Sequence, residues 1–194
     1  MEEKIDKKIE TKIKKELLNI ASYYICLFFI FSAIGWVYEV LFEFSRGSGF
    51  INRGFLYGCY LPIYGFGILI LYFTLNKLMK KKLYIAKLNI TPVLMFLAIL
   101  VISSTIEYLS SWILELIFNQ RWWDYTYEKY HLNGRIFLKN CILIAVAGMA
   151  AIYGLEPLIR KLLSNVKTNL LNYLAIIIAT VVTIDFIITL MRYF

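Results

Sequence analysis

The sequence predicts an all-α membrane protein with about five transmembrane helices, preceded by an amphipathic N-terminal helix. The chain has 194 residues, 60% of them hydrophobic, and a mean hydropathy of +0.67. Soluble domains are only about 45 to 50% apolar. Five apolar segments also reach the about 20 residues that a helix needs to cross the hydrocarbon core. They cover roughly residues 17–44, 55–75, 92–118, 137–159 and 170–191.

A polar, lysine-rich segment, residues 1–16, precedes the first of these spans. Apolar residues recur there at every fourth position, and two Glu/Lys pairs have the i,i+4 spacing of a helix. These residues are Ile5, Ile9, Ile13 and Leu17, with the pairs Glu3/Lys7 and Glu10/Lys14. We expect either a cytoplasmic amphipathic helix at the membrane surface or a solvated extension of the first span. No small-residue cleavage site follows the apolar run, so we expect no removable signal peptide. Residues 17–194 then form a single transmembrane domain.

The basic residues predict the orientation of the chain. With a cytoplasmic N-terminus, fourteen of the 21 Lys and Arg residues lie on the inner side of the membrane, as the positive-inside rule favours. The net charge of +8 then follows from topology and from attraction to anionic lipids. We therefore expect a multi-pass protein whose partner is the lipid bilayer, and no nucleic-acid partner.

One short pattern occurs twice in the chain. Trp36-Val37-Tyr38-Glu39-Val40-Leu41-Phe42 ends the first span, and Trp112-Ile113-Leu114-Glu115-Leu116-Ile117-Phe118 ends the third. Each copy is followed by a cluster of Asn, Gly and Arg, and later by a Tyr-Gly pair. The first and third spans run in the same direction. We therefore predict two parallel repeat halves, residues 17–75 and 92–159, with the last helix left over.

The repeat places a glutamate at the same height in two membrane helices. Trp, Glu and Phe at i, i+3 and i+6 share one helix face, because successive residues advance by about 100°. Glu43 extends this face one turn after Glu39, and Glu107 precedes Glu115 by eight residues. A carboxylate in the bilayer must be protonated or paired. The expected partners, near the outer face, are Arg53 and Arg135. These pairs either lock each hairpin or line a shared polar cavity for a substrate or an ion.

Three other parts of the chain contain candidate site residues. The Trp pair in residues 119–126 fits either the aromatic belt of the membrane interface or the floor of a pocket. Residues 62–67 place Pro and two Gly inside the second predicted span, as a kink with close packing through Gly65 or as an unwound half-helix. The last span contains an aspartate that nothing in its own segment neutralises. The further predicted site residues are Asn52, Tyr64, Trp123, Asp124, Asn133 and Asp185.

No motif in the sequence specifies an enzyme, a metal site or a cofactor. Cys26, Cys59 and Cys141 lie in apolar runs without Cys-x-x-Cys spacing, and His131 has no nucleophile beside it in the sequence. The pattern Gly-x-x-x-x-Gly-Lys-Ser/Thr does not occur, so an ATP-driven role requires a separate ATPase subunit. We expect no catalytic residues, no cofactor and no bound metal.

Several long motifs resemble one bacterial family. They are Ser32-x-x-Gly35-Trp36-x-x-Glu39, Asn52-Arg53-Gly54-Phe55-Leu56-x-Gly58, Pro62-Ile63-Tyr64-Gly65-Phe66-Gly67, Trp122-Trp123-Asp124-Tyr125 and Leu132-Asn133-Gly134-Arg135-Ile136. With them the chain resembles the CmpB-like family of type IV ABC-transporter permeases, from the first span through the fourth. It departs from the family in having Gly58-Cys59 where Gly-Pro is usual. The resemblance implies a transport component of the bacterial cytoplasmic membrane, working with an ATPase subunit or with further copies of itself.

Three other functions fit the same residues. A substrate-binding membrane subunit, like those of energy-coupling-factor transporters, would hold a small ligand in its outer loops. A membrane-embedded enzyme acting on lipid headgroups would use Glu39, Glu115 or Asp124 as general acid or base. In a structural or regulatory partner, every charge named above would belong to an internal pair.

Overall fold

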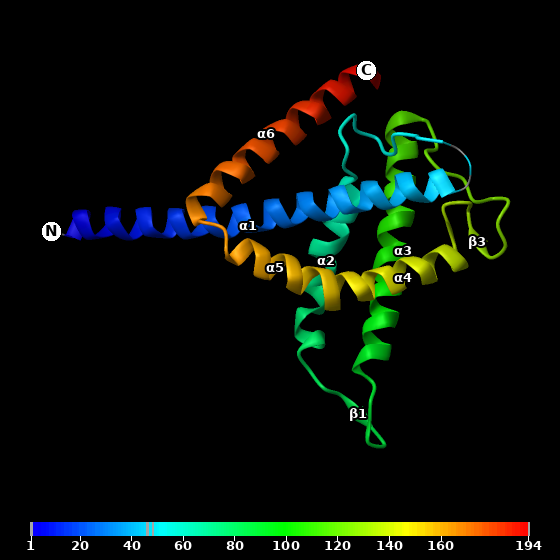
Figure 1. Cartoon of the computed structure of the whole chain (residues 1–194), viewed down its shortest axis with the longest axis horizontal. Helices are drawn as coiled ribbons and strands as arrows, with labels where there is room; N and C mark the ends of the chain where they lie inside the picture. The colour runs from blue at the N-terminus through cyan, green and yellow to red at the C-terminus, as the bar shows by residue number, and fades with distance from the viewer. Residues whose placement is uncertain (1, 46, 48, 194) are drawn as a thin grey trace. The chain divides into compact units, whose positions relative to one another are not determined.

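The computed structural model describes residues 2–45, 47 and 49–193, and it is 74% helical (Figure 1). Within these residues, five helices are long and apolar enough to cross a membrane. They are Ile9–Ser45, Pro62–Met79, Thr91–Phe118, Leu138–Ser164 and Thr168–Tyr193. The predicted class, an all-α polytopic membrane protein with five spans, is confirmed.

The first helix, α1 (Glu2–Ser45), contains both the lysine-rich segment and the first span without a break. Its 44 residues correspond to about 66 Å, whereas the hydrocarbon core is about 30 Å thick. The Nζ atom of Lys14 lies 2.6 Å from Oε1 of Glu10, as the i,i+4 spacing predicts. The side chains of Ile5, Glu3 and Lys7 lie outside those that the structure describes. The lysine-rich segment is therefore a helical extension of the first span.

The second helix, α2 (Pro62–Met79), begins seven residues later than predicted. Residues 50–61 form no helix or strand, although they are apolar. Proline is favoured in the first turn of a helix, where its missing N–H leaves no bond unmade. Pro62 therefore starts α2, and the prediction of an unwound half-helix over residues 62–67 is wrong, because these residues are helical.

Close packing through Gly65 is confirmed. A Cβ atom at Gly65 would lie 2.3 Å from Oγ of Ser32 and 2.5 Å from the carbonyl oxygen of Phe28, both on α1. Gly35 lies three residues after Ser32 on α1, and a Cβ atom there would lie 2.3 Å from Cγ of Tyr64. The absence of side chains at these two positions lets the start of α2 approach the backbone of α1.

A small β-hairpin connects α2 to the third helix. Strand β1 (Tyr84–Ile85) pairs antiparallel with β2 (Leu88–Asn89). The third helix is α3 (Thr91–Phe118). Asn119 caps its end with a left-handed backbone (φ 49°), and the N–H of Asn119 donates to the carbonyl of Glu115. The predicted bounds of this span are correct to one residue.

The fourth span contains three consecutive segments after a second hairpin, formed by β3 (His131–Leu132) and β4 (Ile136–Phe137). They are α4 (Leu138–Ala150), the π-helical segment η1 (Ala151–Leu155) and α5 (Glu156–Ser164). Pro157 has no N–H, and its ring crowds the carbonyl four residues earlier. The backbone widens just before it, and the N–H of Glu156 donates to the carbonyl of Ala151, five residues back. The last helix is α6 (Thr168–Tyr193).

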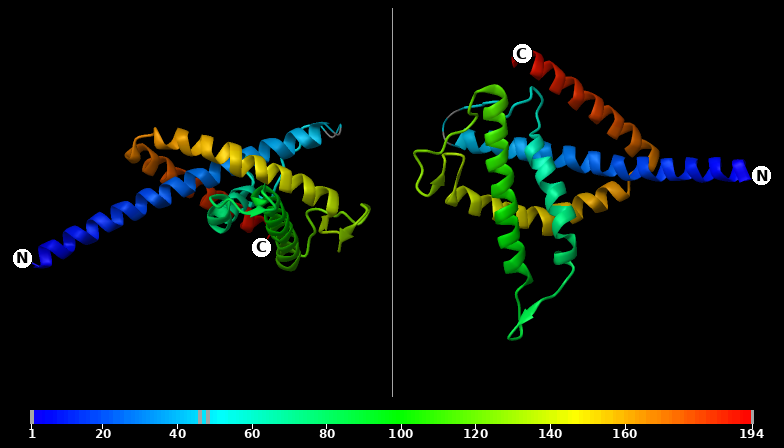
Figure 2. Two further views of the ribbon diagram at one scale, coloured as in Figure 1. Left: turned by 90° about the horizontal axis from the view of Figure 1, so that it is seen from below. Right: turned by 180° about the vertical axis from the view of Figure 1, so that it is seen from behind.

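The chain divides into two compact units. The first contains residues 1–65 and 159–194, and the second contains residues 66–158. In the first unit, Cys26 of α1 packs with Leu171 and Ala175 of α6. Figures 1 and 2 show α6 meeting α1 near the start of α6 and then diverging from it. In the second unit, Ile99 of α3 packs against Gly148 of α4.

Candidate functional site

The predicted pair of Glu39 and Arg53 forms in the first unit. Nη2 of Arg53 lies 3.8 Å from Oε2 of Glu39 and 3.8 Å from Oε1 of Glu43, so one guanidinium faces two carboxylates. The hydroxyl of Tyr64 donates to Oε1 of Glu39 at 2.6 Å. The structure thus joins Glu39, Glu43, Arg53 and Tyr64 in one group, the Glu39 cluster. The side chain of Glu39 remains 25% exposed.

Asn52 lies beside this cluster and connects the repeated Trp36 to residues 50–61. Nε1 of Trp36 donates to Oδ1 of Asn52 at 2.6 Å, and Nδ2 of Asn52 donates to the carbonyl of Tyr57 at 3.1 Å. The sequence did not predict this contact. The contact could have been inferred from two features of the sequence. Trp36 precedes Glu39 by one turn on the same helix face, and Asn52 directly precedes Arg53, the partner of Glu39.

The second predicted pair, Glu115 with Arg135, also forms, in the second unit. Nη2 of Arg135 lies 2.5 Å from Oε2 of Glu115. A second arginine joins them, since Nη2 of Arg121 lies 3.3 Å from Oε1 of Glu115. Arg121 is not among the predicted site residues. The contact could have been inferred because Arg121 follows Glu115 by only six residues and the helix ends between them, before Asn119.

Asp124 extends this group, which we call the Glu115 cluster. Nη1 of Arg121 lies 3.5 Å from Oδ1 of Asp124, and the N–H of Thr126 donates to the same oxygen at 3.0 Å. The hydrogen bond from the Thr126 backbone, with the charge of Arg121 adding to it, holds the pKa of Asp124 below its usual value. Asp124 is therefore ionised at neutral pH, and it fixes the loop beside Arg121.

The hairpin of β3 and β4 positions Arg135. Asn133 (φ 51°), Gly134 (φ 68°) and Arg135 form its turn, and the N–H of Arg135 donates to the carbonyl of Leu132 at 3.0 Å. Nε1 of Trp123 donates to the carbonyl of Arg135 at 2.9 Å. Trp123 thus has a defined hydrogen bond inside the site in addition to any interfacial role.

Asn133 and Glu107 have their own partners around the cluster. Nδ2 of Asn133 donates to the hydroxyl of Tyr108 at 2.9 Å, and Nδ2 of Asn140 donates to Oε1 of Glu107 at 3.0 Å. Glu107 is only 8% exposed. Its contact with Asn140 places it between α3 and α4, whereas Glu115 contacts Arg121 and Arg135.

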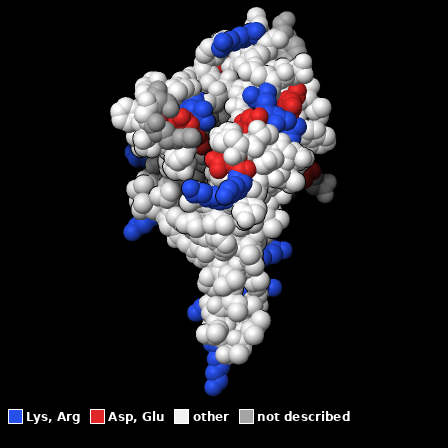
Figure 3. All heavy atoms as spheres, turned by 90° about the vertical axis from the view of Figure 1, so that its right-hand side faces the viewer, with Lys and Arg blue, Asp and Glu red and all other residues white. Residues whose placement is uncertain are grey.

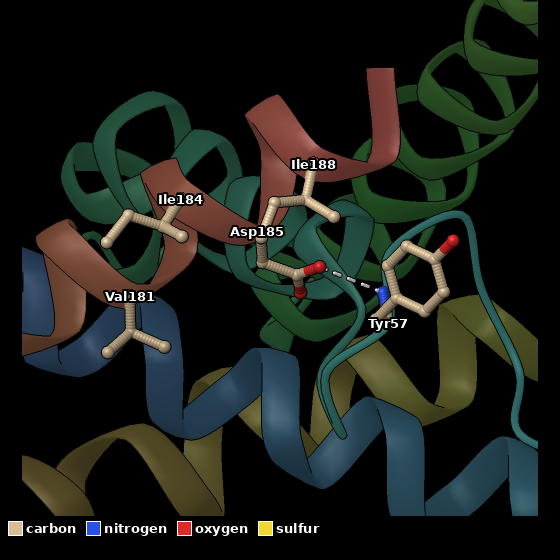
Figure 4. Close-up of a pocket in the computed structure, with 5 residues that line it drawn as sticks. All are labelled: Tyr57, Val181, Ile184, Asp185 and Ile188. Atoms are coloured by element: carbon tan, nitrogen blue, oxygen red, sulfur yellow. Dashed lines mark hydrogen bonds between the residues drawn. The ribbon is translucent and has the colours of Figure 1, made fainter. Parts of the chain in front are cut away.

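Asp185 fixes a different part of the first unit (Figure 4). Its carboxylate accepts hydrogen bonds from the N–H of Tyr57 at 3.1 Å, the N–H of Gly58 at 2.9 Å and the hydroxyl of Tyr60 at 2.5 Å. Thr189, one turn later on α6, adds a fourth at 3.3 Å. Burial, followed by the contact with Asp185, raises the pKa of Tyr60 well above its usual value. Asp185 is thus stabilised by hydrogen-bond donors, most of them from residues 57–60.

Two open grooves lie elsewhere in the described structure. One, of about 360 Å³, is lined by Asp185 with Tyr57 and aliphatic residues of α6 (Figure 4). The other, of about 580 Å³, is lined by residues 127–130, 137–139, 142 and 143. Neither lining includes Glu39 or Glu115. The two clusters are therefore partly exposed ion pairs rather than the walls of these grooves.

The described residues contain no group of three or more His, Cys, Asp or Glu side chains that could hold a metal ion. The chemistry that the clusters can provide is the exchange of ionic partners. Each has a carboxylate and a guanidinium that bind each other and that are both partly exposed. Arginine and carboxylate groups bind charged ligands in the geometry that they use with each other.

Comparison with known proteins gives one match. Residues 26–190 match the family described as "Putative ABC-transporter type IV". No curated protein and no solved structure matches the chain. The match reaches residue 190 and so includes most of α6, which extends the predicted resemblance beyond the fourth span. By this match over most of its length, with five helices that can span a membrane, the chain belongs to the family of type IV ABC-transporter proteins.

Proposed function

We propose that this chain is the membrane-spanning permease component of an ABC transporter in the bacterial cytoplasmic membrane. The family match over residues 26–190 is the observation that supports this function. The sequence contains no phosphate-binding loop of the Gly-x-x-x-x-Gly-Lys-Ser/Thr type. A separate ATPase subunit then supplies the energy, and the permease works with it and with further copies of itself.

Within this function, the Glu39 and Glu115 clusters contact the transported substrate. Ionisable residues in membrane helices are costly and commonly mark substrate or ion pathways. Glu39 is 25% exposed and Glu115 is 33% exposed, so a ligand can reach their carboxylates. A partly exposed ion pair can exchange one partner for a ligand without leaving a buried charge unpaired, whereas a fully buried pair cannot.

The experiment compares Glu39→Gln and Glu115→Gln with a matched control, Glu10→Gln. Glutamine keeps the size of the side chain but cannot form the ion pair with arginine. Glu10 also pairs with a basic residue, but it lies on the exposed surface of α1. The tagged chain is purified with its ATPase from the native host and is reconstituted into vesicles. ATP-dependent accumulation from a metabolite extract of the host is then measured by mass spectrometry.

We expect both cluster variants to lose accumulation, while Glu10→Gln transports like the wild type and all three proteins reach the membrane equally. Full accumulation by both cluster variants would show that the carboxylates do not act in transport. If no ATPase activity accompanies the purified wild-type chain and no compound accumulates with ATP, the transporter function itself is wrong.

A further inference from the structure

The hairpin between α2 and α3 has one apolar and one polar face. Tyr84 pairs with Asn89 and Ile85 pairs with Leu88, and the N–H of Ile90 donates to the carbonyl of Leu83 at 2.9 Å. Because side chains alternate between the two faces of a strand, the residues divide into two sets. Leu83, Ile85, Leu88 and Ile90 share one face, and Lys82, Tyr84 and Asn89 share the other.

The apolar face of this hairpin is uncovered in the described structure. Ile85 is 63% exposed and Leu88 is 72% exposed. A two-stranded hairpin is marginally stable in water, and this one turns at Ala86 (φ 48°) and Lys87 (φ 69°), where Asn-Gly is preferred. An apolar environment on one side would remove this exposed surface from water.

The base of the hairpin is nevertheless firmly held. Oγ1 of Thr91, the first residue of α3, accepts a hydrogen bond from the N–H of Leu83 at 2.9 Å. The same hydroxyl donates to the carbonyl of Lys81 at 3.0 Å. Thr91 is buried. The hairpin is therefore a defined surface with a fixed direction relative to α3.

Lysines surround this surface. Lys77, Lys80, Lys81, Lys82 and Lys87 are exposed, and residues 77–90 contain no Asp or Glu. Figure 3 shows the same asymmetry, since the hairpin, at the bottom of the view, has blue side chains and no red ones on the face in view. The charge of the hairpin is complementary to an anionic partner.

The length of α2 and the apolar start of α3 favour a position of the hairpin at the edge of the bilayer. The 18 residues of α2 correspond to about 27 Å, which is close to the thickness of the hydrocarbon core. The sequence of α3 is apolar from Pro92 and Val93 onward. Both ends of the hairpin therefore emerge near the boundary of the hydrocarbon, in the layer of lipid headgroups.

We propose that residues 80–90 form a binding surface for anionic phospholipids, lying flat on the bilayer. The face of Leu83, Ile85, Leu88 and Ile90 contacts the acyl chains, and the lysines bind the headgroup phosphates. This surface shares no residue with either charged cluster, and its binding to lipid does not depend on transport.

The test measures the depth of single spin labels on the two faces of the hairpin. Leu88→Cys and Asn89→Cys are made in the full chain with Cys59→Ser, because Cys59 is the exposed cysteine among the three. Each labelled protein is placed in vesicles of phosphatidylcholine with and without phosphatidylglycerol. We expect the label at position 88 to collide with oxygen and be shielded from an aqueous nickel chelate when phosphatidylglycerol is present. The label at position 89, on the opposite face, is expected to collide with the nickel chelate.

A charge control separates anionic-lipid binding from simple burial. Lys80, Lys81, Lys82 and Lys87 are changed together to Gln, and Lys161→Gln with Lys167→Gln serves as the matched variant elsewhere. Removing the hairpin lysines should lower the ratio of phosphatidylglycerol to phosphatidylcholine retained by the purified protein about tenfold or more, whereas the control should change it little. Equal nickel accessibility at positions 88 and 89 overturns the proposal. Such a result would mean that both faces of the hairpin are in water, as they would be if the surface bound a soluble protein instead of lipid. Unchanged lipid retention after loss of the four lysines overturns it as well.

Discussion

Asp185 illustrates how a single charged residue can fix a segment that has no regular structure. Its carboxylate binds two consecutive backbone N–H groups, those of Tyr57 and Gly58, from 128 and 127 residues away in sequence. Residues 50–61 form no helix or strand, so these groups have no ladder partner. In an apolar environment each unmade bond would be costly. Asp185 therefore helps to determine where α2 begins, although it lies on α6.

Replacing Asp185 with Asn should destabilise the protein by about 2 kcal/mol, because hydrogen bonds to a charged acceptor are stronger than those to a neutral amide. The measurement is thermal unfolding in detergent, with amide hydrogen exchange at Tyr57 and Gly58 as the local readout. Asp6→Asn, an exposed aspartate on α1, is the matched control and should leave both unchanged. Unaltered exchange at both amides in Asp185→Asn would show that the carboxylate does not hold the segment.

Several contacts at this scale could be predicted from the sequence and others could not. The pairs Glu39/Arg53 and Glu115/Arg135 were predicted, because membrane carboxylates need a counter-charge and each hairpin offers an arginine close by. The role of Arg121 depends on the turn at Asn119, and that of Asp185 depends on the fold of residues 57–60. Both contacts result from backbone conformation that hydropathy does not encode.

Among the elements, α2 shows why hydropathy locates a span better than its ends. Residues 55–61 are apolar and continue directly into the helix, so the predicted span began at residue 55. The helix begins only at Pro62, because residues 55–61 are not helical and proline favours the first turn of a helix. For α3 the apolar run and the helix begin together at a Thr-Pro pair, and the prediction was correct to one residue.

Two glycines of α2 provide a test of the packing between α2 and α1. Gly65→Ala should destabilise the protein by about 1 to 3 kcal/mol, because its Cβ would lie 2.5 Å from the backbone oxygen of Phe28. Gly67→Ala is the control, since a Cβ there meets nothing within 4 Å and alanine favours a helix by about 0.5 to 1 kcal/mol. Thermal unfolding of the two variants should therefore shift in opposite directions. Equal shifts would contradict the close approach of the helices.

Across the whole molecule, the number of spans could be predicted because each apolar run is long enough and is separated from the next by charged or polar residues. The two compact units were not predicted, since they depend on which helices pack together. The division into parallel repeat halves stays a prediction, and so does the cytoplasmic position of the N-terminus.

The orientation can be tested with the cysteines of the chain. Cys59 is exposed, while Cys26 and Cys141 are buried. With the N-terminus inside, Cys59 follows the first outward span, and a membrane-impermeant maleimide should label it in intact cells. Lys80→Cys in a Cys59→Ser background is the control, and it should be labelled only after the membrane is permeabilised. The reverse pattern would show that the chain is inserted the other way round.

The unbroken length of α1 also has a mechanical consequence. A helix that continues from Glu2 to Ser45 behaves as a stiff rod over its whole length. The stretch from residue 2 to residue 16 adds about 22 Å before residue 17, where the predicted first span starts, at about 1.5 Å per residue. A tilt of the span by about 10° would then carry the far end sideways by about 4 Å. A tilt of the Glu39-bearing part of α1 would thus be transmitted along the helix to its lysine-rich end.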